Sequence, residues 1–195
     1  MDTAKKQLVV ATGNKHKLKE IAEIFPDYEI LSQKQMGFDE DVEENGLTFA
    51  ENALIKARAA CKALGLPVIA DDSGICVDVL NGAPGIYSAR YCGAHGDDKG
   101  NRVLLLKNLE GETNRKAHFH CAVALVYPDG KEIVVEGKTH GEILHAEDGE
   151  GGFGYDPIFF NGDLQKSFGV ASAEEKNSVS HRFRALQLLR KEMKQ

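Results

Sequence analysis

The chain has 195 residues, a formal net charge of −6 at neutral pH and 28% charged residues. A chain of this length forms one large domain or two small lobes and has an ample hydrophobic core. The acidic balance argues against a protein that coats nucleic acid, because such proteins need a basic surface to contact phosphates. The first apolar run lasts only from Leu8 to Ala11, which is too short for a signal peptide or a membrane span. We therefore expect a cytoplasmic protein with neither a nucleic-acid nor a membrane partner.

The four cysteines show no CxxC spacing, and each stands in an apolar stretch or beside a turn. This pattern indicates reduced cysteines of a cytosolic protein rather than a disulfide framework or a zinc site. They are Cys61, Cys76, Cys92 and Cys121.

A polar loop, Thr12-Gly13-Asn14-Lys15-His16-Lys17, separates a predicted strand over residues 7–11 from a stretch with apolar residues at helical spacing. The free backbone N–H groups of a first helical turn favour phosphate, and Lys15 and Lys17 add positive charge. The loop therefore has the composition of an anion-binding site. A plain strand-to-helix turn capped by Asn14 is an equally good interpretation of this stretch alone.

An acidic segment, residues 39–44, follows a short strand predicted over residues 29–32. Such runs usually serve solubility, but a carboxylate from this one beside Asp72 would form a hard, oxygen-lined Mg²⁺ site. Thr48-Phe49-Ala50-Glu51 then matches a capping box and predicts a helix that ends at Gly65. Lys56 falls off the apolar face of that helix, either as a surface lysine or as a cation turned toward a ligand.

The stretch Val68-Ile69-Ala70-Asp71-Asp72-Ser73-Gly74 runs from apolar residues directly into two carboxylates. We interpret its first three residues as the end of a buried strand. The ends of strands in open α/β sheets are where ligands bind, and buried carboxylates need a cation, donors or water. The alternative is an Asx-turn in which Asp71 or Asp72 caps a bend closed by Gly74.

Three further elements follow in the middle of the chain. Residues 75–79 alternate like a half-buried strand, and Asp97 is expected to cap a helix that runs to Leu109. The longest predicted strand, over residues 117–127, is joined by a turn to a strand over residues 132–139, which indicates a hairpin.

Two histidines, His118 and His120, share one face of the longest predicted strand. That spacing is compatible with a metal site. Lys116 shares the same face, and we therefore favour a solvated or interface surface.

A glycine-rich stretch, residues 149–157, contains Phe153, Gly154, Tyr155 and Asp156. Glycines let a backbone approach a ligand closely, and two aromatic rings in such a loop can stack on a flat base. Pro157 favours an extended Asp156 that accepts a hydrogen bond from a base edge. The alternative is a glycine-rich link whose aromatic side chains fill the core.

The last predicted helix opens with Ser180-His181-Arg182, after a second capping box over residues 172–175. Cations in the first turn of a helix oppose its dipole. Their presence suggests that an anionic or hydrogen-bonding group meets them.

Seven motifs, in colinear order over nearly the whole chain, resemble the inosine triphosphate pyrophosphatase family, whose members hydrolyse dITP, ITP and XTP. Together they are far more specific than any one alone. They are Thr12-Gly13-Asn14-x-x-Lys17, Val42-Glu43-Glu44-x-Gly46-x-Thr48-Phe49-x-Glu51-Asn52-Ala53, Ala70-Asp71-Asp72-Ser73-Gly74, Pro84-Gly85-x-Tyr87-Ser88-Ala89-Arg90, Phe153-Gly154-Tyr155-Asp156-Pro157, Glu175-Lys176-Asn177 and Ser180-His181-Arg182.

The resemblance implies a single α/β domain over residues 1–195, with an elongated mixed-sheet fold of two lobes around a central nucleotide-binding cleft. It also implies a homodimer and Mg²⁺-assisted hydrolysis of a nucleoside triphosphate to the monophosphate and pyrophosphate. Asp72 is then the general base and a metal ligand, and Glu43 is the second metal ligand. The implied substrate-binding residues are Thr12, Gly13, Asn14, Lys15, His16, Lys17, Ser73, Phe153, Gly154, Tyr155, Asp156, Lys176, His181 and Arg182. Structural roles remain open for Glu44, Glu51, Asp71 and Lys56.

Substrate selection would follow from the purine's 6-keto group, which accepts a hydrogen bond where adenine presents a donor. A donor such as Lys176 or Arg182 would be left unpaired by adenine. Two alternatives stay open. One is a pyrophosphatase for other modified nucleotides, including the related septum-inhibitor-like family that acts on pyrimidines, and the other is a sensor that binds a triphosphate without cleaving it.

Overall fold

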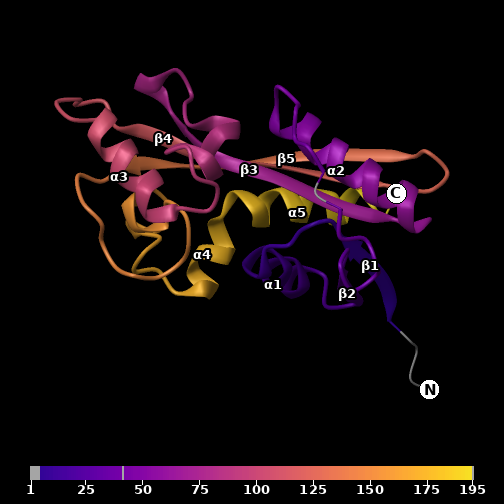
Figure 1. Ribbon diagram of the computed structural model, residues 1–195. Helices are drawn as coiled ribbons and strands as arrows, with labels where there is room; N and C mark the ends of the chain where they lie inside the picture. The colour runs from indigo at the N-terminus through magenta and orange to yellow at the C-terminus, as the bar shows by residue number, and fades with distance from the viewer. Residues whose placement is uncertain (1–4, 41, 195) are drawn as a thin grey trace. The chain divides into compact units, whose positions relative to one another are not determined.

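The computed structural model describes residues 5–40 and 42–194. Its strands form a seven-stranded mixed sheet in the order β2-β1-β3-β4-β5-β6-β7. Figure 1 shows β1 and β2 side by side. β1 pairs in parallel with β2 and β3, whereas the β5-β6-β7 end is antiparallel. The predicted α/β class is confirmed. The strands are β1 Lys6–Val10, β2 Tyr28–Ser32, β3 Val68–Val77, β4 Lys116–Val126, β5 Glu132–Ile143, β6 Phe159–Asn161 and β7 Lys166–Ser167.

Five α-helices and three short 3₁₀ turns are described along residues 5–40 and 42–194. The α-helices are α1 Lys15–Ile24, α2 Phe49–Leu64, α3 Asp98–Asn108, α4 Ala173–Val179 and α5 His181–Glu192. The 3₁₀ turns are η1 Asp78–Leu80, η2 Gly85–Arg90 and η3 Asp156–Ile158. In the described part of the chain, none of the helices is both long enough and apolar enough to cross a membrane.

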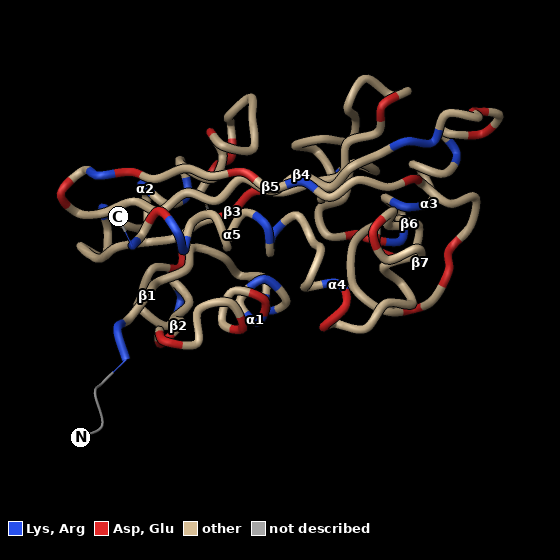
Figure 2. Tube along the Cα trace, turned by 180° about the vertical axis from the view of Figure 1, so that it is seen from behind, with Lys and Arg blue, Asp and Glu red and all other residues tan. Residues whose placement is uncertain are grey.

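The chain divides into two compact units, each assembled from separate segments. The first unit comprises Met1–Asp72, Cys121–Gly137 and Phe183–Gln195, and the second comprises Ser73–His120 and Lys138–Arg182. β3, β4 and β5 therefore each contribute residues to both units. Lys and Arg residues and Asp and Glu residues are both spread along the trace (Figure 2).

The first unit has its own core, built by β1, α1 and α5 together with parts of β3 and β4. Its buried members are Leu8, Val10, Ile21, Ile24, Phe25, Ile69, Cys121, Val123, Leu125, Ala185, Leu186 and Leu189. The predicted hairpin turn is present, since the N–H of Tyr127 donates to the carbonyl of Lys131 and Gly130 adopts a φ of 89°. This core holds β1 and β3 in place. The polar loop after β1 and the two aspartates within β3 belong to the candidate site.

The second unit has a core rich in aromatic rings. Its buried members are Ile75, Val77, Leu105, Leu109, Ala117, Phe119, Ile143, Tyr155, Ile158, Phe159 and Phe168. Phe119 and Phe159 meet edge to face with ring centroids 4.7 Å apart. β6 and β7, which are only three and two residues long, were not predicted, because segments this short carry no readable alternation.

Both predicted N-cap residues, Thr48 and Ser172, cap their helices. Only the second of the two predicted capping boxes has both of its reciprocal hydrogen bonds. Thr48 accepts from the N–H of Glu51, but the Glu51 carboxylate accepts from Leu47 rather than from the cap residue. In the second box the contacts between Ser172 and Glu175 are reciprocal. α2 ends as predicted at Gly65, which has a left-handed φ of 64° that only glycine adopts cheaply.

One prediction is wrong at the centre of the sheet. Strand β3 does not end at Ala70 but continues as a single strand to Val77, and Val79 lies in the turn η1 rather than in a second strand. The two carboxylates need no turn, because each finds a polar partner while remaining in the strand: Lys17 for Asp71 and Asn52 for Asp72. The second strand of the hairpin, β5, likewise runs four residues past its predicted end, to Ile143.

Candidate active site

The predicted anion-binding loop connects β1 to α1 in the first unit. Asn14 caps the helix, and its side-chain oxygen accepts from the N–H groups of His16 at 2.9 Å and Lys17 at 3.3 Å. Thr12 accepts from the N–H of Asn14 at 3.1 Å and so closes the turn. The structure thus shows the cap, while Gly13, Lys15 and His16 lie exposed at the surface.

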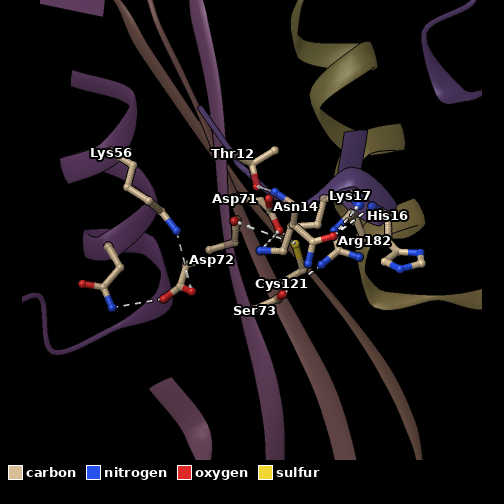
Figure 3. Close-up of polar contacts among 12 residues, drawn as sticks. Thr12, Asn14, His16, Lys17, Lys56, Asp71, Asp72, Ser73, Cys121 and Arg182 are labelled. Atoms are coloured by element: carbon tan, nitrogen blue, oxygen red, sulfur yellow. Dashed lines mark hydrogen bonds and ion pairs between the residues drawn. The ribbon is translucent and has the colours of Figure 1, made fainter. Parts of the chain in front are cut away.

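Lys17 and Asp71 form an ion pair inside the first unit. The ammonium lies 2.9 Å from Oδ2 of Asp71, whose side chain is fully buried. The thiol of Cys121 lies 3.9 Å from the same oxygen. Figure 3 shows Lys17 reaching from the start of α1 toward Asp71. Asp71 is therefore a structural partner of a lysine that was predicted to bind phosphate.

Asp72, the next residue of β3, is held by two side chains of α2. Oδ2 accepts from the amide of Asn52 at 3.0 Å, and Oδ1 lies 3.9 Å from the ammonium of Lys56 (Figure 3). The same ammonium donates to Glu44 at 3.1 Å. Burial raises the pKa of the Asp72 carboxyl, and the charge of Glu44 acts in the same direction, whereas Lys56, Lys17 and the Asn52 amide oppose the shift. The balance leaves the pKa above its ordinary value.

Glu44 and Asp72 both lie near the ammonium of Lys56. Carboxylate oxygens are ligands that Mg²⁺ prefers. Glu43, the predicted second ligand, is exposed in the same loop. The loop also includes Asp41, which lies outside the described residues. Over the described ranges, no three His, Cys, Asp or Glu side chains come close enough together to hold a metal ion. The oxygen donors fit a divalent cation in kind.

A second polar cluster lies in the second unit, around the glycine-rich loop. The ammonium of Lys176 donates to Asp156 at 2.7 Å, and both side chains are more than nine-tenths buried. The same ammonium lies 4.3 Å from the ring centroid of Phe153. Asp156 was expected to be extended but opens the turn η3. Its Oδ2 accepts from the N–H of Phe153 at 2.8 Å, which accounts for the tighter conformation.

Tyr155 belongs to the core rather than to an open stacking surface. It is 5% exposed, and its hydroxyl donates to the carbonyl of Ser88 at 2.8 Å. Burial raises the pKa of this phenol far above its usual value. Gly154 is fixed on both sides, because its N–H donates to Asp98 and its carbonyl accepts from Arg102, each at 2.8 Å. Within the loop, the partly exposed Phe153 is thus the aromatic ring best suited to contact a base.

The start of α5 carries the remaining predicted residues. Arg182 is 1% exposed and donates to the hydroxyl of Ser73 at 2.9 Å (Figure 3). His181 stacks on Phe119, with ring centroids 4.8 Å apart and an interplanar angle of 12°. Ser73 directly follows Asp72 in β3, so the residue that Arg182 contacts is the sequence neighbour of the Asp72 carboxylate.

Comparison with known proteins identifies the relatives of this chain. The model of the Ham1 family matches residues 8–192. The chain belongs to the Ham1 family. This confirms the resemblance inferred from the seven motifs.

Two curated relatives illustrate how close the similarity is. The dITP/XTP pyrophosphatase of Streptomyces coelicolor is 49% identical over 189 residues, covering 94% of each chain. The dITP/XTP pyrophosphatase of Clostridium perfringens is 48% identical over 199 residues, covering 97% of this chain and 98% of that one.

Solved Ham1 structures share the fold. The Ham1 protein of Staphylococcus aureus has a TM-score of 0.89 at 45% identity, and that of Coxiella burnetii has a TM-score of 0.89 at 38% identity. Each match covers 97% of this chain and 98% of the other.

Sequence reasoning missed one polar residue of the candidate site. Asn52 belongs to one of the seven motifs and no role was predicted for it, although it contacts Asp72 directly. Asn52 and Lys56 are four residues apart on α2 and therefore share one face. That spacing is the signal in the sequence that links the two residues.

Proposed function

We propose that this protein hydrolyses non-standard purine nucleoside triphosphates, namely ITP, dITP, XTP and dXTP, to the monophosphate and pyrophosphate. The observation that carries the proposal is Asp72, a buried carboxylate in the middle of β3 whose two oxygens face an amide and an ammonium. Ham1 membership and the names of the curated relatives support the same activity. The enzyme is a hydrolase acting on the α-β phosphoanhydride.

Asp72 serves as the general base. A buried carboxyl with a raised pKa accepts a proton more readily than an ordinary aspartate does. In the reaction the water oxygen forms a bond to the α-phosphorus while its proton passes to Asp72. The bond from the α-phosphorus to the bridging oxygen breaks, and pyrophosphate leaves with that electron pair. No covalent enzyme intermediate is needed.

Mg²⁺ is the proposed cofactor, held by Asp72 and by a carboxylate of the acidic loop, Glu43 or Glu44. The chemistry supplied by bound Mg²⁺ is neutralisation of charge on the departing pyrophosphate. Lys56, which contacts Glu44 and approaches Asp72, supplies positive charge at the same carboxylates. The loop Thr12 to Lys17 binds the triphosphate, with Ser73 assisting.

Recognition of the base is assigned to the second cluster. Phe153 offers a partly exposed ring beside an ammonium, and Lys176 and Arg182 are donors suited to a 6-keto oxygen. Gly154, Tyr155, Asp156 and His181 shape the surroundings of these groups. Because adenine presents an amino group at position 6, it would leave such a donor unpaired, at a cost of about 1–3 kcal/mol.

The test is pyrophosphate release from ITP, dITP, XTP, dUTP and dGTP in the presence of Mg²⁺. Preferential release from the first three supports the proposal. Preference for dUTP would favour a pyrophosphatase for other modified nucleotides, and binding of ITP without release would favour a sensor. Omission of the metal, with EDTA as control, should abolish release, and restoration by Mg²⁺ checks the cofactor assignment.

We further propose that residues 1–195 act as one ITPase-like domain and form a homodimer. Each unit is built from discontinuous segments, and three strands run through both, so neither unit corresponds to a separable piece of chain. A single cooperative calorimetric transition and a dimer mass by light scattering are the expected results. Two resolved transitions or a monomer mass would contradict the respective assignment.

A further inference from the structure

Asn52 is a buried amide that connects two parts of the candidate active site. It lies in the first turn of α2 and is 1% exposed. Its Oδ1 accepts from the backbone N–H of Gly46 at 2.9 Å, and its Nδ2 donates to Oδ2 of Asp72 at 3.0 Å. One side chain thus joins the acidic loop to the carboxylate proposed as the base.

The orientation of this amide follows from the chemistry of its partners. A backbone N–H can only donate, so the oxygen of Asn52 must face Gly46. The nitrogen then faces Asp72, whose ionised carboxylate can only accept. Both contacts are satisfied in one rotamer of one side chain, and exchanging oxygen and nitrogen would break both of them.

Gly46 makes this close approach possible. A Cβ at position 46 would lie 2.7 Å from Oδ1 of Asn52, which is closer than side-chain carbons tolerate. Two residues before Gly46, Glu44 is tied to the same helix through Lys56 at 3.1 Å. Asn52 and Lys56, spaced four apart on one face of α2, therefore hold both the loop and Asp72.

We propose that Asn52 is a positioning residue that fixes the Asp72 carboxylate and keeps the acidic loop beside it, so that the carboxylates are preorganised for the metal ion. This rests on the proposed function. By donating to Oδ2, the amide sets the rotation of the carboxylate and directs Oδ1 toward Lys56. Outer partners that orient metal-binding carboxylates in this way contribute about 10–100-fold to metal affinity or activity.

The test compares Asn52→Leu with a matched control, Asn161→Leu, in the full-length protein. Asn161 is equally buried, donates to the hydroxyl of Thr139 at 2.8 Å and accepts from the N–H of Leu164 at 2.9 Å. Asn52→Leu loses one donor contact and one backbone contact, whereas Asn161→Leu loses one donor contact and two backbone contacts, to the N–H groups of Asp163 and Leu164. Both variants should lose folding stability. The measurements are Mn²⁺ binding without nucleotide, followed by electron paramagnetic resonance, and kcat and KM for ITP with saturating Mg²⁺.

For Asn52→Leu we expect Mn²⁺ binding weakened, or kcat lowered, by about 10–100-fold, with KM for ITP changed much less. Asn161→Leu should keep both Mn²⁺ affinity and kcat within about twofold of wild type. If Asn52→Leu does not fold, Asn52→Ser, whose shorter side chain gives up the contact with Asp72, is measured in its place with the same expectation.

Wild-type Mn²⁺ affinity and kcat in a folded Asn52 variant would overturn the inference, as would equal losses in the Asn161 control. Neither result would affect the proposed function, which depends on pyrophosphate release by the wild-type protein. Conversely, a wild-type protein that releases no pyrophosphate would contradict the proposed function. The comparison of Mn²⁺ binding would still decide whether Asn52 is a positioning residue.

Discussion

The ammonium of Lys17 lies 2.9 Å from Oδ2 of Asp71, and the Asp71 side chain is fully buried while that of Lys17 is 16% exposed. A buried carboxylate loses most of its hydration, and a cation at contact distance compensates for that loss. The loop that was predicted to bind phosphate therefore contacts β3 through the ion pair of Lys17. This ion pair contributes to folding as well as to charge in the site.

Replacing Lys17 by Met should lower the free energy of unfolding by about 3–5 kcal/mol, because the fully buried Asp71 carboxylate loses the cation at contact distance. The double variant with Asp71→Asn should recover much of this loss, since no charge then remains to be paired. Urea denaturation followed by circular dichroism measures both.

Lys15→Met provides the matched control, because Lys15 is exposed two residues earlier in the same loop. It should change the free energy of unfolding by no more than about 0.5 kcal/mol. A Lys17→Met protein as stable as this control would show that the ion pair contributes nothing to folding.

Gly74 is packed against the segment that follows η1. A Cβ at this position would clash with the carbonyl of Gly85 and with the hydroxyl of Ser88. That hydroxyl also accepts from the N–H of Ile75 at 2.9 Å and donates to Gly85 at 2.6 Å. Gly74→Ala should thus destabilise the protein by about 1–3 kcal/mol through overpacking.

The comparison for Gly74 is Gly13→Ala, since no heavy atom lies within 4 Å of a Cβ at Gly13 and its φ is not positive. Thermal unfolding of the two variants side by side is sufficient. If Gly74→Ala has the same melting temperature as Gly13→Ala and the wild type, the prediction is wrong, and the backbone around Ser88 can move away from the added methyl group.

These contacts show where sequence patterns succeed and where they stop. Helix caps such as Asn14 and Thr48, and the end of α2 at Gly65, were predicted because their signals are local. The course of β3 was not, because Asp71 stays in the strand only through Lys17, 54 positions earlier in the sequence, and no local pattern records that partner. For the same reason Asp156 was predicted to be extended, while its contacts with Phe153 and Lys176 hold it in a turn.

His118 should make stability depend on pH. It lies half-buried between His120 on the same strand and His140 on β5, with ring centroids 6.3 Å and 5.4 Å away. Burial lowers the pKa of His118, Lys138 and the two other histidines add to the effect, and Asp78 opposes it. Because the unfolded chain binds this proton more readily than the folded one, stability is lost as the pH falls through the ordinary histidine range, near 6.5.

The melting temperature of the wild type should therefore fall between pH 7.5 and pH 5.5, and it should fall less in His118→Gln. His145→Gln, which removes an exposed histidine, should follow the wild-type curve. Parallel curves for all three proteins would contradict the assignment to His118.

The most direct test of the account is pyrophosphate and IMP production from ITP by wild-type protein and by Asp72→Asn, with folding checked by circular dichroism. Asn is nearly isosteric with Asp but cannot accept the proton of water as a carboxylate does. We expect one pyrophosphate and one IMP per ITP from the wild type, and a turnover at least about 100-fold lower in the folded variant. Comparable turnover in Asp72→Asn, or release of orthophosphate in place of pyrophosphate, would contradict the account.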